Sequence, residues 1–423
     1  MMRHEENIKN IMTTRMQWKR NPRQKENCSF LSPLERNRSL KYHHNFNNKS
    51  LLSGILLVVG TVNVIMVCCT QIHPERDAKA SSITARKRIP PFSNHAIAAF
   101  ASKASSSLTC HPSPPDILRD LLQSEMDGTR KNDKQPILLP CCFDGLSARL
   151  VARSGFEATF MTGFGVSGVN GYPDAQLISY AEMSNAANSV SEGLSSAALE
   201  MSTQPIPCIA DGDTGYGNAM NVKRTVFGYG RAGMAGIMIE DQISPKRCGH
   251  VAGKQVVEFG EAVERIRAAC DARDEYESMY GKGTGPLVLA RTDSLVTHGF
   301  EDAIQRCLAF RDVGCDMTFL EAPQTTDQMR EYCQRVSGPK LANMLEYGNT
   351  PILPPEQLKE MGYTLAAYPL TLLSASIKAM KESLQLIRDG LPTNDMILSF
   401  EETKDEVGFT QYSKEEKRYK DDE

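Results

Sequence analysis

Five consecutive residues, Lys246-Arg247-Cys248-Gly249-His250, place a thiol among two cations, an imidazole and a glycine. Neighbouring positive charge lowers the pKa of a cysteine from its usual value of about 8.5. Cys248 is therefore predicted to exchange protons near neutral pH, as a general acid for a carbanion. Gly249 would give this segment the freedom to close over a substrate and exclude water.

Two acidic segments lie upstream of the thiol. Asp211-Gly-Asp213-Thr-Gly-Tyr-Gly217 is the first, and Ile239-Glu240-Asp241 is the second. Carboxylate oxygens are the ligands that hard divalent cations prefer. A cation site beside a reactive thiol indicates chemistry at a carbon acid.

These residues follow short apolar runs that alternate with longer amphipathic stretches. The eight predicted strands are 137–142, 158–162, 206–210, 236–239, 287–290, 317–320, 340–344 and 364–368. The predicted helices are 147–154, 220–232, 258–273, 300–313, 326–336 and 372–388. Eight such units over about 250 residues predict an α/β protein, a (β/α)8 TIM barrel. A doubly wound open sheet is the alternative, but no GxGxxG opens the first helix and two strands would be left over.

A barrel of this kind carries its active site at the carboxyl ends of its strands. Polar residues follow seven of the predicted strands: Thr162-Gly163-Phe164, Asp211 with Asp213, Glu240-Asp241, Arg291-Thr292-Asp293, Glu321, Asn343 and Tyr368-Pro369-Leu370-Thr371. Each alone has an ordinary explanation, such as a helix cap, a surface ion pair or a satisfied polar group. Their common position favours a functional site.

The order of several motifs resembles the isocitrate lyase / phosphoenolpyruvate mutase superfamily. The resemblance covers residues 116–388 and points to the short-chain branch of 2-methylisocitrate lyases, petal death proteins and carboxyphosphonoenolpyruvate phosphonomutases. The motifs are ADGDTGYGN from Ala210, IEDQ from Ile239, SPKRCGH from Ser244, ARTDS from Ala290, LEAP from Leu320, LANMLEYGNTP from Leu341 and AAYPL from Ala366. The resemblance implies a barrel whose last helix is exchanged with a neighbouring subunit, in a homotetramer built as a dimer of dimers.

The resemblance also implies a set of site residues. Its metal site corresponds to Asp211, Asp213 and Glu240, with Mg²⁺ bound largely through water and Mn²⁺ as the alternative ion. Its catalytic residues correspond to Cys248, Arg291, Lys246 and His250. Its substrate contacts correspond to Thr162, Gly163, Phe164, Asp174, Arg247, Gly249, Glu321, Asn343 and Leu370. Phe164 departs from the serine-glycine-glycine form of methylisocitrate lyases, so that specificity does not carry over.

A 2-hydroxy di- or tricarboxylate fits this chemistry, because losing the hydroxyl proton breaks the adjacent carbon–carbon bond and leaves an enolate. Arg291 would hold a substrate carboxylate in bidentate geometry. The predicted activity is a Mg²⁺-dependent carbon–carbon lyase acting on a small carboxylate of the 2-alkylmalate or methylisocitrate type. A wall of Phe164, Tyr216, Leu345 and Leu370 would take a compact apolar group.

Three alternatives remain. Phosphonate-forming mutases, as the family pattern implies, lack the loop cysteine, which favours a lyase over a phosphonomutase. An oxaloacetate hydrolase is mechanistically adjacent, and Thr371 could choose between hydrolase and lyase. A non-catalytic metabolite-binding barrel is disfavoured by the intact carboxylates, thiol and arginine.

The amino-terminal part differs in charge from the rest. Residues 1–112 carry 17 Lys and Arg against 6 Asp and Glu, although the whole chain of 423 residues has a net charge of −3. No zinc-finger or helix-turn-helix pattern accompanies these cations, so no nucleic-acid partner is expected. The 12 cysteines contain no CxxC, which fits a reducing compartment.

Residues 51–69 form an uncharged, mostly apolar run. The preferred interpretation of residues 1–112 is an otherwise disordered leader that is cleaved on entry into a plastid or mitochondrion. The alternative is a membrane anchor, if 51–69 is retained. The barrel is predicted over 113–397, and 398–423 is predicted to be a charged, solvated tail.

Overall fold

The computed structural model describes residues 112–249 and 253–420, which lie in the second of two units, Pro91–Glu423. The predicted leader, its apolar run 51–69 and His250 fall outside the described residues. Within the described ranges, no helix has both the length and the apolar character that crossing a membrane requires.

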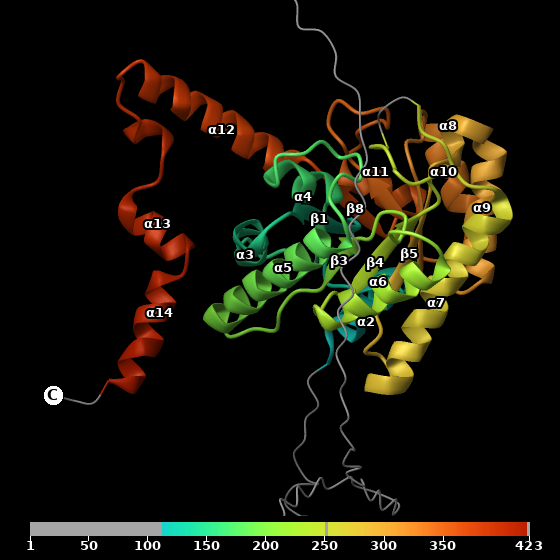
Figure 1. The fold of residues 1–423 in the computed structure, drawn as a ribbon, viewed down its shortest axis with the longest axis horizontal. Helices are drawn as coiled ribbons and strands as arrows, with labels where there is room; N and C mark the ends of the chain where they lie inside the picture. Colours follow the sequence, from blue (N-terminus) through green and yellow to red (C-terminus); the bar gives the residue numbers. More distant parts are fainter. Residues whose placement is uncertain (1–111, 250–252, 421–423) are drawn as a thin grey trace, which may run out of the picture. The chain divides into compact units, whose positions relative to one another are not determined.

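Eight parallel strands form one sheet that curves into a barrel (Figure 1). The strands are β1 (Ile137–Cys142), β2 (Thr159–Met161), β3 (Cys208–Asp211), β4 (Gly236–Glu240), β5 (Leu287–Thr292), β6 (Met317–Leu320), β7 (Leu341–Asn343) and β8 (Leu365–Tyr368). Their order is β6-β5-β4-β3-β2-β1-β8-β7, and an isolated parallel bridge between Thr318 and Lys340 joins the two end strands. The prediction of an eight-stranded barrel is confirmed.

The described helices are α2 (Pro114–Met126), α3 (Gly145–Arg153), α4 (Gly163–Val169), α5 (Tyr180–Met201), α6 (Ala219–Arg231), α7 (Phe259–Tyr280), α8 (Ser294–His298), α9 (Phe300–Asp312), α10 (Thr326–Arg335), α11 (Pro355–Met361), α12 (Thr371–Arg388), α13 (Phe400–Glu406) and α14 (Phe409–Glu416). Those up to α11 lie around the sheet, whereas α12, α13 and α14 extend away from it (Figure 1). Capping boxes begin several of them, as at Ser179, where Glu182 lies at the third helical position. All six predicted helices are present, within a few residues except at the end of α7.

The barrel interior is an apolar core closed at the amino-terminal end of the strands. Leu139, Ile209 and Leu289 fill it and are fully buried. Leu118 and Leu122 of α2 join the same core. Each buried leucine contributes roughly 1.5–3 kcal/mol. Since this end is packed with apolar side chains, the carboxyl ends of the strands are left to carry a site.

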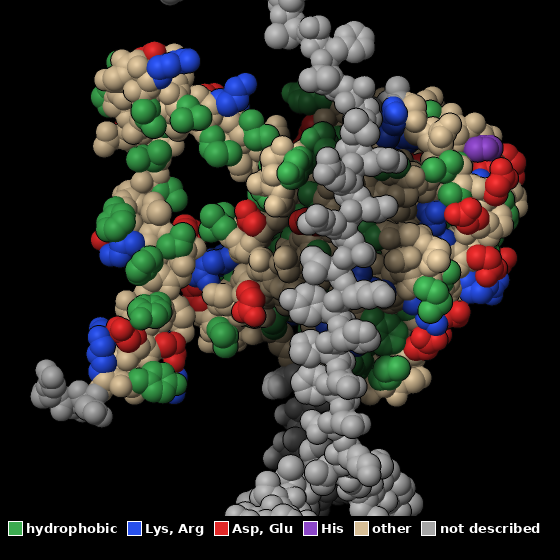
Figure 2. Space-filling view, in the orientation of Figure 1, with side chains coloured by type: hydrophobic (Ala, Val, Ile, Leu, Met, Phe, Trp, Pro, Cys, Tyr) green, Lys and Arg blue, Asp and Glu red, His purple; other side chains and the backbone are tan. Residues whose placement is uncertain are grey.

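The segment after β8 has little of its apolar surface buried. Leu373 is the buried residue of α12, whereas Ile377, Met380, Leu384 and Ile387 are each at least 45% exposed and recur at helical spacing. Figure 2 shows hydrophobic side chains along this part of the chain. The predicted charged tail contains α13 and α14, and an ion pair of 2.7 Å joins Asp405 to Arg153 of α3.

Candidate active site

A cavity opens at the carboxyl ends of the strands and contains about 590 Å³ of space, including solvent at its mouth. Its polar lining consists of Thr162, Asp174, Asp211, Lys246, Cys248, Gly249, Arg291, Glu321 and Asn343. Its apolar lining consists of Cys141, Phe160, Phe164, Met238, Phe319, Leu341, Leu345, Ala367, Pro369 and Leu370. The cavity therefore combines groups that bind a carboxylate with walls that accept an apolar group.

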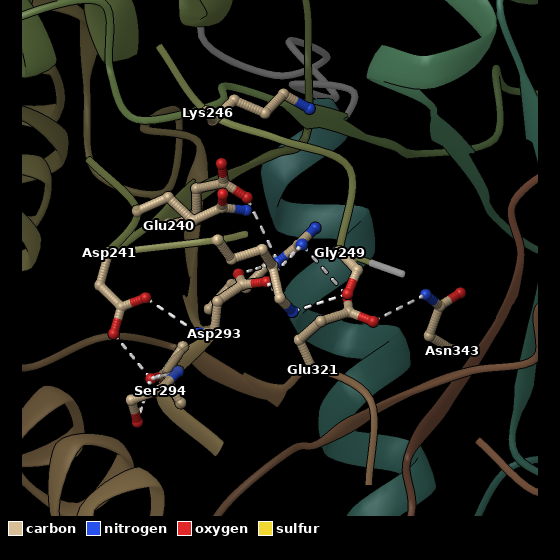
Figure 3. A network of polar contacts seen from close by, with 12 residues as sticks. Glu240, Asp241, Lys246, Gly249, Asp293, Ser294, Glu321 and Asn343 are labelled. Carbon is tan, nitrogen blue, oxygen red and sulfur yellow. Dashed lines mark hydrogen bonds and ion pairs between the residues drawn. The ribbon is translucent and has the colours of Figure 1, made fainter. Parts of the chain in front are cut away.

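Arg291, at the end of β5, lies among the carboxylates of Glu240, Asp293 and Glu321, which are labelled in Figure 3. Its Nε lies 2.8 Å from Oδ2 of Asp293 and 3.3 Å from Oε2 of Glu240. Its Nη2 lies 3.3 Å from Oε2 of Glu321. Burial alone would lower the pKa of Arg291, but Asp293, Glu321 and Glu240 raise it well above the usual value. The guanidinium is thus a fixed positive charge at the cavity wall.

Lys246 lies beside Asp174 and Asp213, and its side chain is 3% exposed. Its Nζ lies 2.6 Å from Oδ1 of Asp174 and 3.0 Å from Oδ1 of Asp213. Burial alone would lower the pKa of this ammonium, but Asp213, Asp211 and Asp174 raise it well above its usual value. Its charge is therefore directed first toward the carboxylates of Asp174 and Asp213, rather than toward the Cys248 thiol as predicted.

Asp211 ends β3 and faces the cavity between two backbone donors. Its Oδ1 accepts a hydrogen bond of 2.9 Å from the Asp213 amide, and its Oδ2 accepts one of 3.2 Å from the Gly163 amide. A Cβ at Gly163 would lie 2.5 Å from Oδ2 of Asp211, so this approach requires a glycine. Burial raises the pKa of Asp211 to about 6, against the opposing effect of Lys246.

Asp211, Asp213 and Glu240 form an acidic group at the carboxyl ends of β3 and β4. Several of its buried carboxylate oxygens accept no hydrogen bond from the described residues. They are both carboxylate oxygens of Glu240, which is fully buried, and Oδ1 of Asp213. Their cations lie close enough for charge attraction but are not aligned as donors. Burial raises the pKa of Glu240 well above its usual range, although Arg291 opposes this. Buried acceptors that lack donors are what a cation with bound water would satisfy.

The acidic group does not form a complete set of direct metal ligands. Over residues 112–249 and 253–420, no three acidic, histidine or cysteine side chains converge closely enough to hold a metal ion by themselves. Mg²⁺ tolerates this, because it keeps several waters and needs only one or two carboxylates together with substrate oxygens. Asp211, Asp213 and Glu240 thus fit Mg²⁺ bound mainly through water.

The thiol segment, residues 246–249, is fixed by side chains that bind its backbone. The Gln242 side chain accepts from the Arg247 amide at 3.0 Å and donates to the Arg247 carbonyl at 2.9 Å. Lys254 Nζ donates to the Gly249 carbonyl at 2.6 Å and to Asp293 at 2.9 Å. A Cβ at Gly249 would lie 2.6 Å from Nη2 of Arg291, so the segment passes directly over that guanidinium. Cys248 is thereby positioned at the cavity wall.

A set of buried polar residues around Asp241 supports the residues that line the cavity. Asp241, 1% exposed, accepts from the Thr292 hydroxyl at 2.7 Å and from the Asp293 amide at 2.9 Å. Its charge is balanced by Arg306, whose Nη1 lies 3.2 Å away. These contacts fix the end of β5, which carries Arg291.

The structure brings most of the predicted site residues to one cavity. Gly163, Asp213 and Glu240 lie directly behind the lining residues. Arg247 is exposed and does not line the cavity. Tyr216 was predicted in the apolar wall, but it lies in a neighbouring cavity and packs edge-on against Tyr180, with ring centroids 6.0 Å apart. That prediction was wrong: Tyr216 lies in the loop after β3, where its φ is +61°, and does not line the active-site cavity.

Sequence reasoning missed some residues of the site. Lys254 and Gln242 bind the backbone of residues 247–249. Gln242 ends the IEDQ motif after β4 but was given no role, and Lys254 lies in an irregular segment that no pattern marks. Cys141, 2% exposed, lies in β1 and lines the cavity, although the strand prediction over 137–142 gave it no role. Burial raises the pKa of this thiol well above its usual value. Its inward position in the barrel could have been found from the alternation of side chains along β1.

An eight-stranded parallel barrel with carboxylates, an arginine and a thiol at its carboxyl end defines a class of barrel enzymes. The family model described as phosphoenolpyruvate phosphomutase matches residues 129–388. The chain therefore belongs to this family, within the phosphoenolpyruvate mutase / isocitrate lyase superfamily.

Individual relatives have different activities. The chain is 35% identical to 2,3-dimethylmalate lyase of Eubacterium barkeri over 68% of this chain and 94% of that protein. It is 38% identical to the chloroplastic carboxyvinyl-carboxyphosphonate phosphorylmutase of Arabidopsis thaliana, over 67% and 80%. A structure of oxaloacetate acetylhydrolase with 3,3-difluorooxalacetate matches with a TM-score of 0.62 at 33% identity, over 71% and 95%.

Proposed function

We propose that this protein is a Mg²⁺-dependent carbon–carbon lyase that cleaves a 2-hydroxy di- or tricarboxylate, of the 2-alkylmalate or methylisocitrate type, into a 2-oxo acid and a carboxylate. The observation that carries the proposal is the presence of Cys248 in the same cavity as Arg291, Glu321 and Asn343. A thiol in this place is suited to protonating carbon. The similarity to 2,3-dimethylmalate lyase supports the same assignment.

Mg²⁺ would be held by Asp211, Asp213 and Glu240 and would supply a Lewis acid for the substrate oxygen that becomes a carbonyl. Arg291 binds a carboxylate of the substrate and fixes its orientation. Glu321 keeps the guanidinium in place, at 3.3 Å, and Asn343 donates toward Glu321 at 3.5 Å. Phe164, Leu345 and Leu370 exclude water on the apolar side of the cavity.

The protons balance within one turnover. The substrate hydroxyl loses its proton to one of the buried carboxylates, the carbon–carbon bond breaks, and its electrons form the enolate of the departing carboxylate. Cys248 gives a proton to the enolate carbon. The carboxyl group that took the hydroxyl proton then returns it to the thiolate, directly or through solvent, so that the net change moves one proton from oxygen to carbon.

The test is a cleavage assay on the full chain with 2-alkylmalates, methylisocitrate, isocitrate and oxaloacetate. Cleavage that EDTA abolishes and Cys248→Ser lowers by about 10² or more is expected, since a positioned acid contributes roughly 10²–10⁴. Cys333→Ser is the matched control, because Cys333 is also partly exposed but lies in α10, away from the cavity. Cleavage that persists unchanged in Cys248→Ser would contradict the proton-donor role.

Two other activities have a specific observation behind them. The similarities to oxaloacetate acetylhydrolase and to the phosphorylmutase make oxaloacetate and phosphonopyruvate necessary members of the panel. Hydrolysis of oxaloacetate alone would replace the lyase with a hydrolase. Conversion of phosphonopyruvate to phosphoenolpyruvate, without carbon–carbon cleavage of any substrate, would replace it with a mutase.

The exposed apolar side chains of α12 support the proposal that this helix packs on a neighbouring subunit, in a homotetramer with exchanged last helices. Sedimentation of the full chain tests it, with Leu384→Ser expected to weaken assembly.

The chloroplastic relative supports a plastid for the mature protein, with a mitochondrion as the second location and a membrane only if 51–69 is retained. Fractionation of cells that express the full chain distinguishes these.

A further inference from the structure

Gln176 lies in the segment between α4 and α5 and is partly buried. Its φ is +56°, a left-handed backbone conformation that residues other than glycine rarely adopt. Glycine would take this conformation without strain, so the side chain of Gln176 is present despite a backbone that disfavours it.

The Gln176 side-chain amide makes three hydrogen bonds to two separate parts of the site. Its Oε1 accepts from the Ser244 hydroxyl at 2.7 Å and from the Lys246 backbone amide at 3.1 Å. Its Nε2 donates to the Thr214 hydroxyl at 3.0 Å. One side chain thus connects the segment that begins at Ser244 with the loop after β3, which carries the acidic group.

The contacts of Gln176 complement those of Asp174, two residues earlier. Asp174 binds the Nζ of Lys246 at 2.6 Å, whereas Gln176 binds the Lys246 backbone amide. The same segment therefore holds Lys246 at both ends. On the far side, Gln242 holds the next residue, Arg247, by its amide and its carbonyl.

We propose that Gln176 is a positioning residue for the proposed lyase reaction: it fixes the backbone of Ser244–Lys246 and thereby places Lys246 and Cys248 at the cavity. Gln176 is not among the residues that line the cavity, so it acts through the segment that it holds. This inference rests on the proposed function for its kinetic consequence. Its structural consequence, a held segment, is independent of the substrate.

The test uses Gln176→Gly in the full chain. This change removes all three side-chain hydrogen bonds while leaving a residue that accepts the positive φ. Ser202→Gly is the matched control, because Ser202 has a φ of +54° and is exposed at the end of α5, remote from the cavity. Gln176→Glu is the conservative variant, since its carboxylate still accepts from Ser244 and Lys246 and the Thr214 hydroxyl can turn to donate.

The first readout needs no substrate. Trypsin cleavage at the Arg247–Cys248 bond, followed by mass spectrometry, should become about tenfold to thirtyfold faster in Gln176→Gly, as expected for the loss of two ordinary hydrogen bonds to the segment. The thermal unfolding temperature should not fall, Ser202→Gly should cleave like the wild type, and Gln176→Glu should recover most of the protection. An unchanged cleavage rate in Gln176→Gly overturns the proposal.

The second readout is kinetic, on whichever panel substrate the wild type cleaves. We expect kcat to fall about tenfold in Gln176→Gly with a smaller change in KM, because the reacting groups are displaced while Arg291 still binds the carboxylate. Faster proteolysis with unchanged kcat overturns the positioning role. If the wild type cleaves no substrate of the panel, the proposed function fails, and the proteolysis alone decides whether Gln176 holds the segment.

Discussion

Replacing Asp293 with asparagine should destabilise the barrel more than any exposed charge change. Asp293 is completely buried and lies between two buried cations, 2.8 Å from Nε of Arg291 and 2.9 Å from Nζ of Lys254. Asparagine keeps the shape but removes the charge, and its amide nitrogen would face donors. Removing one partner of a buried ion pair costs about 3–5 kcal/mol, and we expect a loss in this range at neutral pH.

The dependence of this loss on pH follows from the pKa of Asp293. Burial alone would raise that pKa, but Arg291 and Lys254 lower it below the usual range. A depressed pKa in the folded state contributes stability that is fully present above the unfolded value of about 3.9 and is lost as the pH falls below it. The difference between wild type and variant should therefore be equal at about pH 7 and pH 5 and should shrink below about pH 4.

Urea unfolding of the full chain measures both effects. Asp327→Asn is the control, since Asp327 pairs with Arg330 on the surface at 3.2 Å, its side chain is 92% exposed, and its loss should cost less than about 1 kcal/mol. Asp293 accepts no helix-capping hydrogen bond at α8, so no cap is lost with it. A loss below about 1 kcal/mol for Asp293→Asn would refute the view that its two ion pairs hold the site together.

Two further predictions concern the acidic side of the cavity. Gly163→Ala should lower Mg²⁺-dependent cleavage at least about tenfold, in steady-state assays with intact secondary structure by circular dichroism, because its Cβ would lie 2.5 Å from Oδ2 of Asp211; wild-type activity would contradict this. Mg²⁺ binding should weaken below about pH 6 and should release protons, because the pKa of Asp211 is about 6 and carboxylates bind the ion when ionised. Calorimetry in two buffers of different ionisation enthalpy measures the protons, and a heat independent of the buffer would exclude this coupling.

The strands were predictable because a parallel barrel buries both faces of each strand, which leaves short apolar runs in the sequence. Helix α5 was not predicted, although it is one of the two longest described helices. Its serine-rich and alanine-rich sequence reflects close packing on α3, since a Cβ at Gly193 would lie 2.2 Å from the Gly145 carbonyl oxygen. Small residues selected for close approach obscure the apolar periodicity on which helix prediction depends.

The site was predictable to the same extent and for a related reason. Residues at strand ends, such as Arg291 and Glu321, come together because parallel strands finish at one rim. Gln176 and Lys254 come from irregular segments, and their contacts depend on backbone conformations that the sequence does not specify. Periodicity therefore identifies the groups that face a substrate, but not the groups that hold the connecting segments in place.

The balance of charge ties the cation site to the rest of the cavity. The site contains six carboxylates and three buried cations, Lys246, Lys254 and Arg291. Five of the carboxylates, those of Asp174, Asp213, Glu240, Asp293 and Glu321, pair with one or two of these cations. The sixth, that of Asp211, accepts hydrogen bonds from the Gly163 and Asp213 amides. A buried excess of negative charge is costly unless it is protonated or neutralised by a cation. The raised pKa values of Asp211 and Glu240 favour the first solution, and a bound Mg²⁺ would supply the second. The same excess that draws in the cation also keeps Lys246 and Arg291 protonated, so the groups that face a carboxylate substrate stay positive throughout the working pH range.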